Sequence, residues 1–160
     1  MPTFLRLVTD VLSPHYDKII KYSGDHPSKV FKIIPTLIKL TFRITSTKFY
    51  EDDVRWDRST DIIDFYGQWR GKDEKDGRTS IWIKVRVMGK QRTKDKKGNV
   101  TIYLEPYMVT KLRYSNFFDK ALARMYSYFF YGNQRRKYIS RELTYIKQFE
   151  DELKKELGIA

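Results

Sequence analysis

The sequence contains no cysteine and only two histidines, His15 and His26. A chain without cysteine forms no disulfide, no thiolate zinc site and no cysteine nucleophile, and two histidines leave little room for imidazole catalysis. The lack of cysteine fits a reducing compartment, so we expect a cytoplasmic location. No apolar run approaches the ~18 residues that a membrane-spanning helix needs, and the N-terminus lacks a cleavable signal pattern.

Sequence motifs for cofactors and metal ions are also missing. The chain contains no GxGxxG, no GxxxxGK[ST], no HExxH and no EF-hand pattern. His26 follows Asp25 directly, which is more typical of a helix start than of a catalytic pair. We therefore expect a protein that is not an enzyme and that carries no cofactor and no metal ion.

Acidic residues are few compared with basic ones. There are 20 Asp and Glu against 32 Lys and Arg, which gives a formal net charge of +12. An excess of this size suggests an acidic partner, nucleic acid before a membrane surface. The alternative is a composition adapted to heat, although heat adaptation usually raises both kinds of charge together.

Residues 2–44 are predicted to be mainly helical. The spacing of Phe4, Leu7, Val8 and Val11 predicts a short amphipathic helix over residues 2–12. The next segment can be read as a short helix or as a strand at 17–22, and the early start of the following element favours the strand. That element is predicted to be a bent helix from Pro27 to Phe42, because Pro35 lies inside it.

Residues 45–112 alternate with a period of two, which predicts antiparallel strands joined by charged, glycine-bearing loops. The clearest strand places four apolar residues on one side and Trp82, Lys84, Arg86 and Met88 on the other. Pro106 indicates an edge position or a bulge in the last strand. The apolar parity is Ile81, Ile83, Val85 and Val87.

Residues 115–157 have the helical period and no proline. Ser115 or Asn116 is a candidate N-cap and Gly158 a candidate C-terminal stop, while the Gly132-Asn133 step (132–133) is where the helix can break. A single α+β domain over 1–160 follows, with an antiparallel meander sheet of four or more strands packed on a long C-terminal helix.

This order of elements resembles that of helix-grip, or START-like, domains. Members of that fold commonly hold an apolar ligand between sheet and helix. The resemblance therefore implies, as one alternative, a carrier of a small apolar ligand, with a cavity lined by Trp69, Ile83, Met125 and Phe129. Fold similarity does not by itself assign a function.

The outward parity of the sheet favours a second kind of site. Exposed aromatic rings among cations can stack bases and bind phosphates, which predicts a non-catalytic module for RNA or another polyanion. The alternative is an ordinary solvated sheet face. The predicted residues are Arg70, Trp82, Lys84, Arg86, Tyr103 and Tyr107, with Arg135, Arg136 and Lys137 as a second basic cluster.

Two further expectations concern carboxylates and assembly. On a regular strand Glu51 and Asp53 share a face and could hold a hard cation, but ion pairs with neighbouring cations are the favoured reading. The apolar stripe of residues 139–157 is too long for the sheet to cover. We expect it to pack on the N-terminal helix in a monomer; the alternatives are a homodimer and a structural role through this helix.

Overall fold

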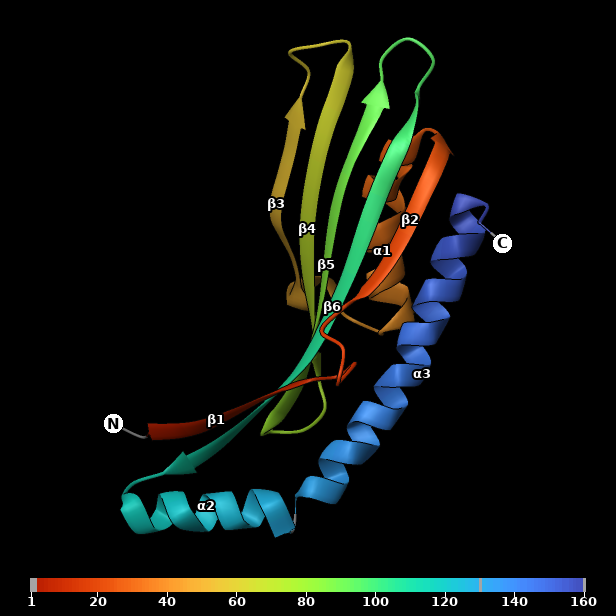
Figure 1. Ribbon diagram of the computed structural model, residues 1–160. Coiled ribbons are helices and arrows are strands. Elements are labelled where there is room, and N and C mark those ends of the chain that lie inside the picture. The colour runs from red at the N-terminus through yellow and green to blue at the C-terminus, as the bar shows by residue number, and fades with distance from the viewer. Residues whose placement is uncertain (1–2, 130, 160) are drawn as a thin grey trace.

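The computed structural model describes residues 3–129 and 131–159, which form a six-stranded antiparallel sheet with helices on its inner face and at its lower end (Figure 1). The strand order is β1-β6-β5-β4-β3, and β2 also pairs with β6. The strands are β1 (Thr3–Asp10), β2 (Lys18–Asp25), β3 (Phe49–Asp57), β4 (Ile62–Glu74), β5 (Thr79–Arg92) and β6 (Lys97–Tyr114), and the helices are α1 (Val30–Thr41), α2 (Phe117–Phe129) and α3 (Gly132–Leu157). Short 3₁₀ turns at Pro27–Lys29 and Ser46–Lys48 precede α1 and β3.

Strands β1 and β2 lie one after the other along the same edge of β6. Asp10 pairs with Tyr107, and Lys18 pairs with Leu104, so the edge is interrupted opposite Pro106. A proline has no N–H to give to a neighbouring strand, so its place at this interruption leaves no strand hydrogen bond unmade. The carbonyl of Pro106 still accepts a hydrogen bond from the Val11 N–H at 3.2 Å.

The helix expected over residues 2–12 is wrong, because Thr3–Asp10 is strand β1. The first two residues lie outside the described part of the chain. The apolar residues fit a helical stripe, but in a strand Phe4 and Val8 lie on one face, and Leu5 and Leu7 on the other. Pairing with β6 along the whole segment selects the extended form. Residues 18–25 form β2, the strand alternative for that segment.

The core lies between the inner face of the sheet and the helices α1 and α3. The inward-facing side chains of β5 are fully buried, whereas the outward-facing Trp82, Lys84 and Arg86 are partly exposed. The buried residues are Ile81, Ile83, Val85 and Val87. The predicted α+β class, with an antiparallel sheet packed on a C-terminal helix, is confirmed. The α1 helix adds Val30, Ile34 and Ile38 to this core.

The C-terminal segment forms two helices, α2 and α3, that meet at a sharp corner (Figure 1). Asn116 caps α2, because its Oδ1 accepts the Asp119 N–H at 2.9 Å. Gly158 ends α3 with a φ of 74°, the left-handed conformation that glycine adopts readily. At the corner, the hydroxyl of Tyr131 bonds to Thr79 and to Asp76, which ties the start of α3 to the sheet.

Most of the apolar stripe of α3 is buried inside the molecule, and the helix that it packs on is α1 rather than a helix over residues 2–12. Ile146, Phe149 and Leu153 are at most 1% exposed. Phe149 packs on Phe42, just after α1, with ring centroids 5.7 Å apart. Helix α1 thus takes the place that the sequence had suggested for residues 2–12.

Candidate nucleic-acid interface

The outer face of the sheet, opposite α1 and α3, carries the predicted row of aromatic and basic side chains. Register brings Arg70 beside Lys84, and Trp82 beside Tyr107. These residues come from three neighbouring strands whose side chains alternate between the two faces. The structure therefore brings together six predicted residues: Arg70, Trp82, Lys84, Arg86, Tyr103 and Tyr107.

Guanidinium groups lie over aromatic rings at several points on this outer face. The Arg70 guanidinium is 5.1 Å from the Trp82 ring centroid and 5.5 Å from that of Tyr50. The Arg86 guanidinium is 4.6 Å from the Tyr103 ring centroid. Such contacts arrange planar surfaces in a row, and bases stack on both aromatic rings and guanidinium planes.

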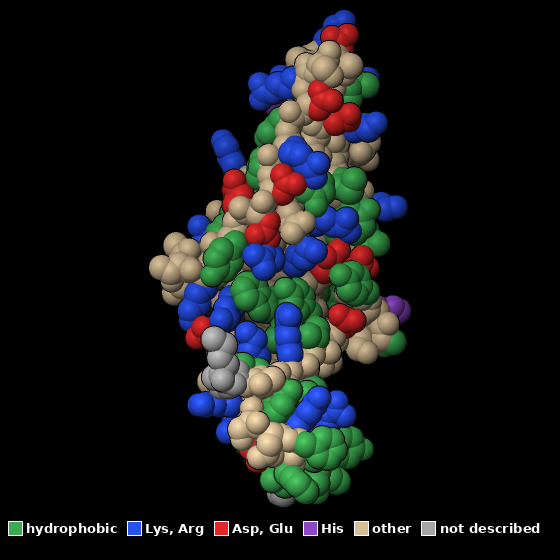
Figure 2. All heavy atoms as spheres, turned by 90° about the vertical axis from the view of Figure 1, so that its left-hand side faces the viewer, with side chains coloured by type: hydrophobic (Ala, Val, Ile, Leu, Met, Phe, Trp, Pro, Cys, Tyr) green, Lys and Arg blue, Asp and Glu red, His purple; other side chains and the backbone are tan. Residues whose placement is uncertain are grey.

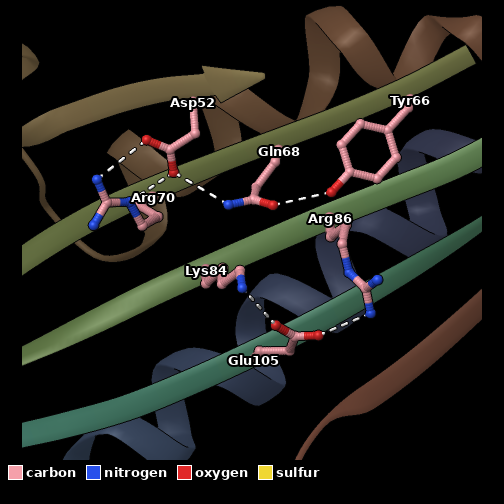
Figure 3. Close-up of polar contacts among 7 residues, drawn as sticks. All are labelled: Asp52, Tyr66, Gln68, Arg70, Lys84, Arg86 and Glu105. Atoms are coloured by element: carbon pink, nitrogen blue, oxygen red, sulfur yellow. Dashed lines mark hydrogen bonds and ion pairs between the residues drawn. The ribbon is translucent and has the colours of Figure 1, made fainter. Parts of the chain in front are cut away.

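Carboxylates hold these cations in place (Figure 3). Asp52 accepts hydrogen bonds from Arg70 Nε at 2.6 Å and from Arg70 Nη2 at 3.1 Å, which raises the pKa of Arg70. Glu105, only 4% exposed, receives Arg86 Nη2 at 3.1 Å and lies 3.4 Å from Lys84 Nζ. The three predicted cations of this face are thus already paired.

These ion pairs reduce the ability of this part of the outer face to bind phosphate. Two carboxylates pair with three cations, so little net positive charge is left around Arg70, Lys84 and Arg86 for a phosphate backbone. Rings and guanidinium planes are left as the main contact surface.

The second predicted basic cluster lies elsewhere, at the start of α3. There Arg135 Nη2 donates to Thr9 Oγ1 at 2.8 Å, and burial lowers the pKa of Arg135. Arg136 and Lys137 remain exposed. These three residues do not join the row on the outer face of the sheet.

A shallow groove of about 930 Å³ extends from this row toward the upper end of the sheet. We call it the outer groove; its lining includes Arg55, Tyr66, Arg86, Met88 and Asn99. The Arg55 guanidinium lies 4.6 Å from the Tyr66 ring centroid, so the groove contains another ring with a stacked cation.

The upper end of the outer groove meets the hairpin between β5 and β6. Lys90 and Asn99, a register pair, line both the groove and a neighbouring hollow of about 480 Å³ that includes Lys97. Lys94 and Lys97 are exposed, and the structure gives them no carboxylate partner within the described residues. The hairpin therefore supplies cations that are available to a phosphate backbone at this end of the groove.

The residues predicted for an apolar-ligand cavity are not brought together. Trp69 and Ile83 are fully buried in the core between sheet and helices. Met125 and Phe129 lie on α2, where they are 54% and 64% exposed. The reason is the corner between α2 and α3, which carries α2 away from the inner face of the sheet (Figure 1).

A β-bulge separates the two carboxylates that a regular strand would place together. The register shifts between Glu51 and Asp53; Glu51 then accepts a hydrogen bond from Trp69 Nε1 at 3.3 Å, while Asp53 pairs with Arg55 at 3.0 Å. Within the described residues no group of three or more His, Asp or Glu side chains is placed to hold a metal ion. None of the described helices is long and apolar enough to cross a membrane.

The sequence analysis did not predict the outer groove, although the alternation of the strands places some of its residues on the outer face. Tyr66 and Met88 share the outward parity with Arg70 and Lys84, so alternation alone could have added them to the site. Arg55 lies opposite Tyr66, on the same face, but the bulge between Glu51 and Asp53 means that alternation counted from Tyr50 would place it on the other face.

The fold and this surface define an α+β protein with an antiparallel sheet whose outer face is aromatic and basic. No family model matches the chain, and no curated protein matches it. Among solved structures it is similar to SA2116, a protein of unknown function from Staphylococcus aureus. The two chains are 8% identical, with 98% of this chain and 95% of that chain covered and a TM-score of 0.31. A similarity of this size assigns no function.

Proposed function

We propose that the protein is a non-catalytic module that binds single-stranded RNA along the outer groove and the β5–β6 hairpin. The observation that carries the proposal is the continuity of two features. Stacked ring and guanidinium planes lie in the groove, where Lys90 pairs with Asp64 at 3.8 Å. The neighbouring hollow shares Lys90 with the groove and includes Lys97, which has no carboxylate partner in the described part of the chain. Single-strand binders combine such stacking surfaces with cations that follow the backbone.

The pairing of Arg70, Lys84 and Arg86 with carboxylates predicts how the binding energy is divided. Stacking is worth about 1–3 kcal/mol per base by substitution. Because stacking on a ring releases no counterions from the phosphates, it adds little to the salt dependence. Phosphate contacts give a slope of log affinity against log salt of about −0.7 per contact for a single strand. We therefore expect a shallow slope that comes mainly from Lys94 and Lys97.

The experiment is a titration of a labelled uridine-rich RNA by fluorescence anisotropy over a series of salt concentrations. Lys94→Ala with Lys97→Ala should weaken binding and make the slope shallower by about 0.7 for each phosphate that no longer meets a lysine. The control pair, Lys32→Ala with Lys147→Ala, removes two exposed lysines from α1 and α3. Equal effects of the two pairs, or no binding by the wild type, would reject the proposal.

The groove is tested separately through its aromatic ring. Tyr66→Leu keeps an apolar side chain but removes the ring, and should cost about 1–3 kcal/mol of binding free energy with an unchanged salt slope. Tyr16→Leu is the control, because Tyr16 is a 60% exposed tyrosine outside the groove. A complementary duplex in place of the single strand should bind more weakly, since paired bases cannot stack on the face.

We also propose that the fold is of the helix-grip type. The arrangement that supports it is the C-terminal helix α3 lying across the inner face of an antiparallel sheet. The carrier function that the resemblance implies is less well supported, because α1 and α3 fill the inner face with core side chains.

A further inference from the structure

Helix α2 rests on the sheet through its polar and small side chains. Asp119, Lys120 and Ala123 are half-buried, at the helical spacing that faces β6. Lys120 Nζ lies 5.6 Å from the Tyr114 ring centroid, and Arg78 Nη1 donates to Tyr126 Oη at 2.9 Å. The helix is therefore held to the protein by the side that would ordinarily face water.

The opposite side of α2 is apolar and exposed. Six large side chains on it are between 54% and 81% exposed. Figure 2 shows hydrophobic side chains gathered at the lower end of the molecule, with Lys and Arg side chains next to them. We call these residues the α2 apolar face: Phe117, Phe118, Leu122, Met125, Tyr128 and Phe129.

The α2 apolar face lies in a basic part of the chain. The segment from Arg113 to Lys137 contains six Lys and Arg residues but only one acidic residue, Asp119. Arg113, Arg136 and Lys137 are exposed. An exposed apolar stripe bordered by cations is typical of helices that lie in the interface of an anionic membrane.

We propose that α2 binds the surface of a membrane containing anionic phospholipids, with its apolar face among the acyl chains and the flanking cations at the head groups. Charge selects this occupant over a second copy of the chain. Two copies joined through the α2 apolar face would bring two basic clusters together, whereas an anionic surface complements them.

The shape of the molecule fits this placement. Helix α2 lies at one end, across the long direction of the sheet, and the rest of the chain extends to one side of it (Figure 1). With 13 residues it is about 20 Å long, so it would lie in the interface rather than span it. This surface is separate from the outer groove and the hairpin, so the inference goes beyond the proposed function.

The lack of cysteine allows a direct test with single labelled positions. Met125→Cys places an environment-sensitive dye on the α2 apolar face, and Leu40→Cys places it on a 72% exposed residue of α1. With vesicles of phosphatidylcholine and phosphatidylserine in a three-to-one ratio, dye emission should shift to the blue at position 125 only. Vesicles of phosphatidylcholine alone should give a much smaller shift.

Flotation of the unlabelled protein with the same vesicles measures binding. Phe118→Gln with Leu122→Gln should weaken vesicle binding about tenfold or more, because two large apolar side chains are removed from the interface. Leu40→Gln is the matched control and should bind as the wild type does. Arg136→Glu with Lys137→Glu should lose binding to the anionic vesicles, and Lys32→Glu should not.

Each remaining outcome would overturn the proposal. A wild-type protein that does not float with anionic vesicles has no such surface. Binding without a shift at position 125 means that α2 does not enter the interface. A dimer in sedimentation that Phe118→Gln with Leu122→Gln converts into a folded monomer would assign the α2 apolar face to a second copy.

Discussion

Glu142 is a fully buried carboxyl group on α3. Lys75 Nζ lies 2.7 Å from Asp73 Oδ2 and 3.0 Å from Glu142 Oε2. The ammonium group of Lys75 therefore forms ion pairs with two carboxylates, of which that of Glu142 is fully buried. Burial raises the pKa of Glu142 to about 7, with Lys75 acting in the opposite direction.

This pKa makes stability depend on pH. Between pH 4.5 and about 7 the folded state keeps a proton that the unfolded state releases, so the free energy of unfolding falls as pH rises through this window. The full effect is roughly 3 kcal/mol. Asp76 and Glu150 have lowered pKa values, so their contributions to stability change with pH below this window. Thermal melts should show the wild type losing stability from about pH 5 to about pH 8.

The variant Glu142→Gln cannot titrate and should give a flatter profile across the same range. It should equal or exceed the wild type in melting temperature at the upper end, where the wild type holds an ionised buried carboxylate. Glu156→Gln, an exposed residue of the same helix, is the control. Identical pH profiles for Glu142→Gln and the wild type would show that Glu142 is not the group responsible.

At the scale of elements, the close approach of β5 and β6 at their hairpin depends on glycine. A Cβ on Gly98 would lie 1.8 Å from the carbonyl oxygen of Lys90, which is backbone and cannot move aside. Gly98→Ala should therefore destabilise the protein by about 1–3 kcal/mol in denaturant unfolding. Gly77→Ala is the control, since nothing lies within 4 Å of its added Cβ. Equal stability of the two variants would contradict this account of the hairpin.

The packing of α3 gives a second prediction at this scale. Phe149 is fully buried against Phe42, whereas Leu143 on the same helix is 41% exposed. Phe149→Ala should cost about 3–5 kcal/mol of unfolding free energy, and Leu143→Ala far less. Sedimentation should show the same mass for both variants and the wild type. A stable Phe149→Ala protein of halved mass would mean that α3 packs between subunits.

Some elements could be predicted from the sequence because one local pattern identifies them. In β5 a strict alternation over eight residues specifies both strand and buried face. Strand β1 is an edge strand with Phe4 and Val8 exposed on its outer face. Its apolar residues therefore fit the helical period and the strand period equally well. The stripe of α2 was correctly read as helical, but periodicity cannot say whether an apolar stripe faces a core or solvent.

The candidate site was predictable to the same limited degree. Parity predicted the outer face for Trp82, Lys84 and Arg86, and the structure has them there. The pairing of Arg86 with Glu105 depends on register between strands, and the pairing of Arg70 with Asp52 depends on a bulge. Both are products of tertiary structure, and they leave Arg70 and Arg86 with carboxylate partners rather than free for a phosphate.

At the scale of the whole molecule, the two proposed surfaces lie at opposite ends of β6. Its 18 residues run from Lys97 at the hairpin to Tyr114 just before α2 (Figure 1). A strand of this length spans up to about 60 Å. The Debye length at physiological salt is about 8 Å, so charges at one end do not influence the other directly. The two surfaces should therefore act independently.

Independence predicts that one molecule can hold RNA and an anionic vesicle at the same time. In flotation with phosphatidylserine-containing vesicles, labelled RNA should rise with the vesicles only when the protein is present. Lys94→Ala with Lys97→Ala should leave the protein floating without RNA, because its α2 apolar face is intact. Phe118→Gln with Leu122→Gln should leave RNA bound to protein that stays at the bottom. If vesicles instead displace RNA from the wild type, the two ligands share one basic surface, and the division of the molecule into two binding ends is wrong.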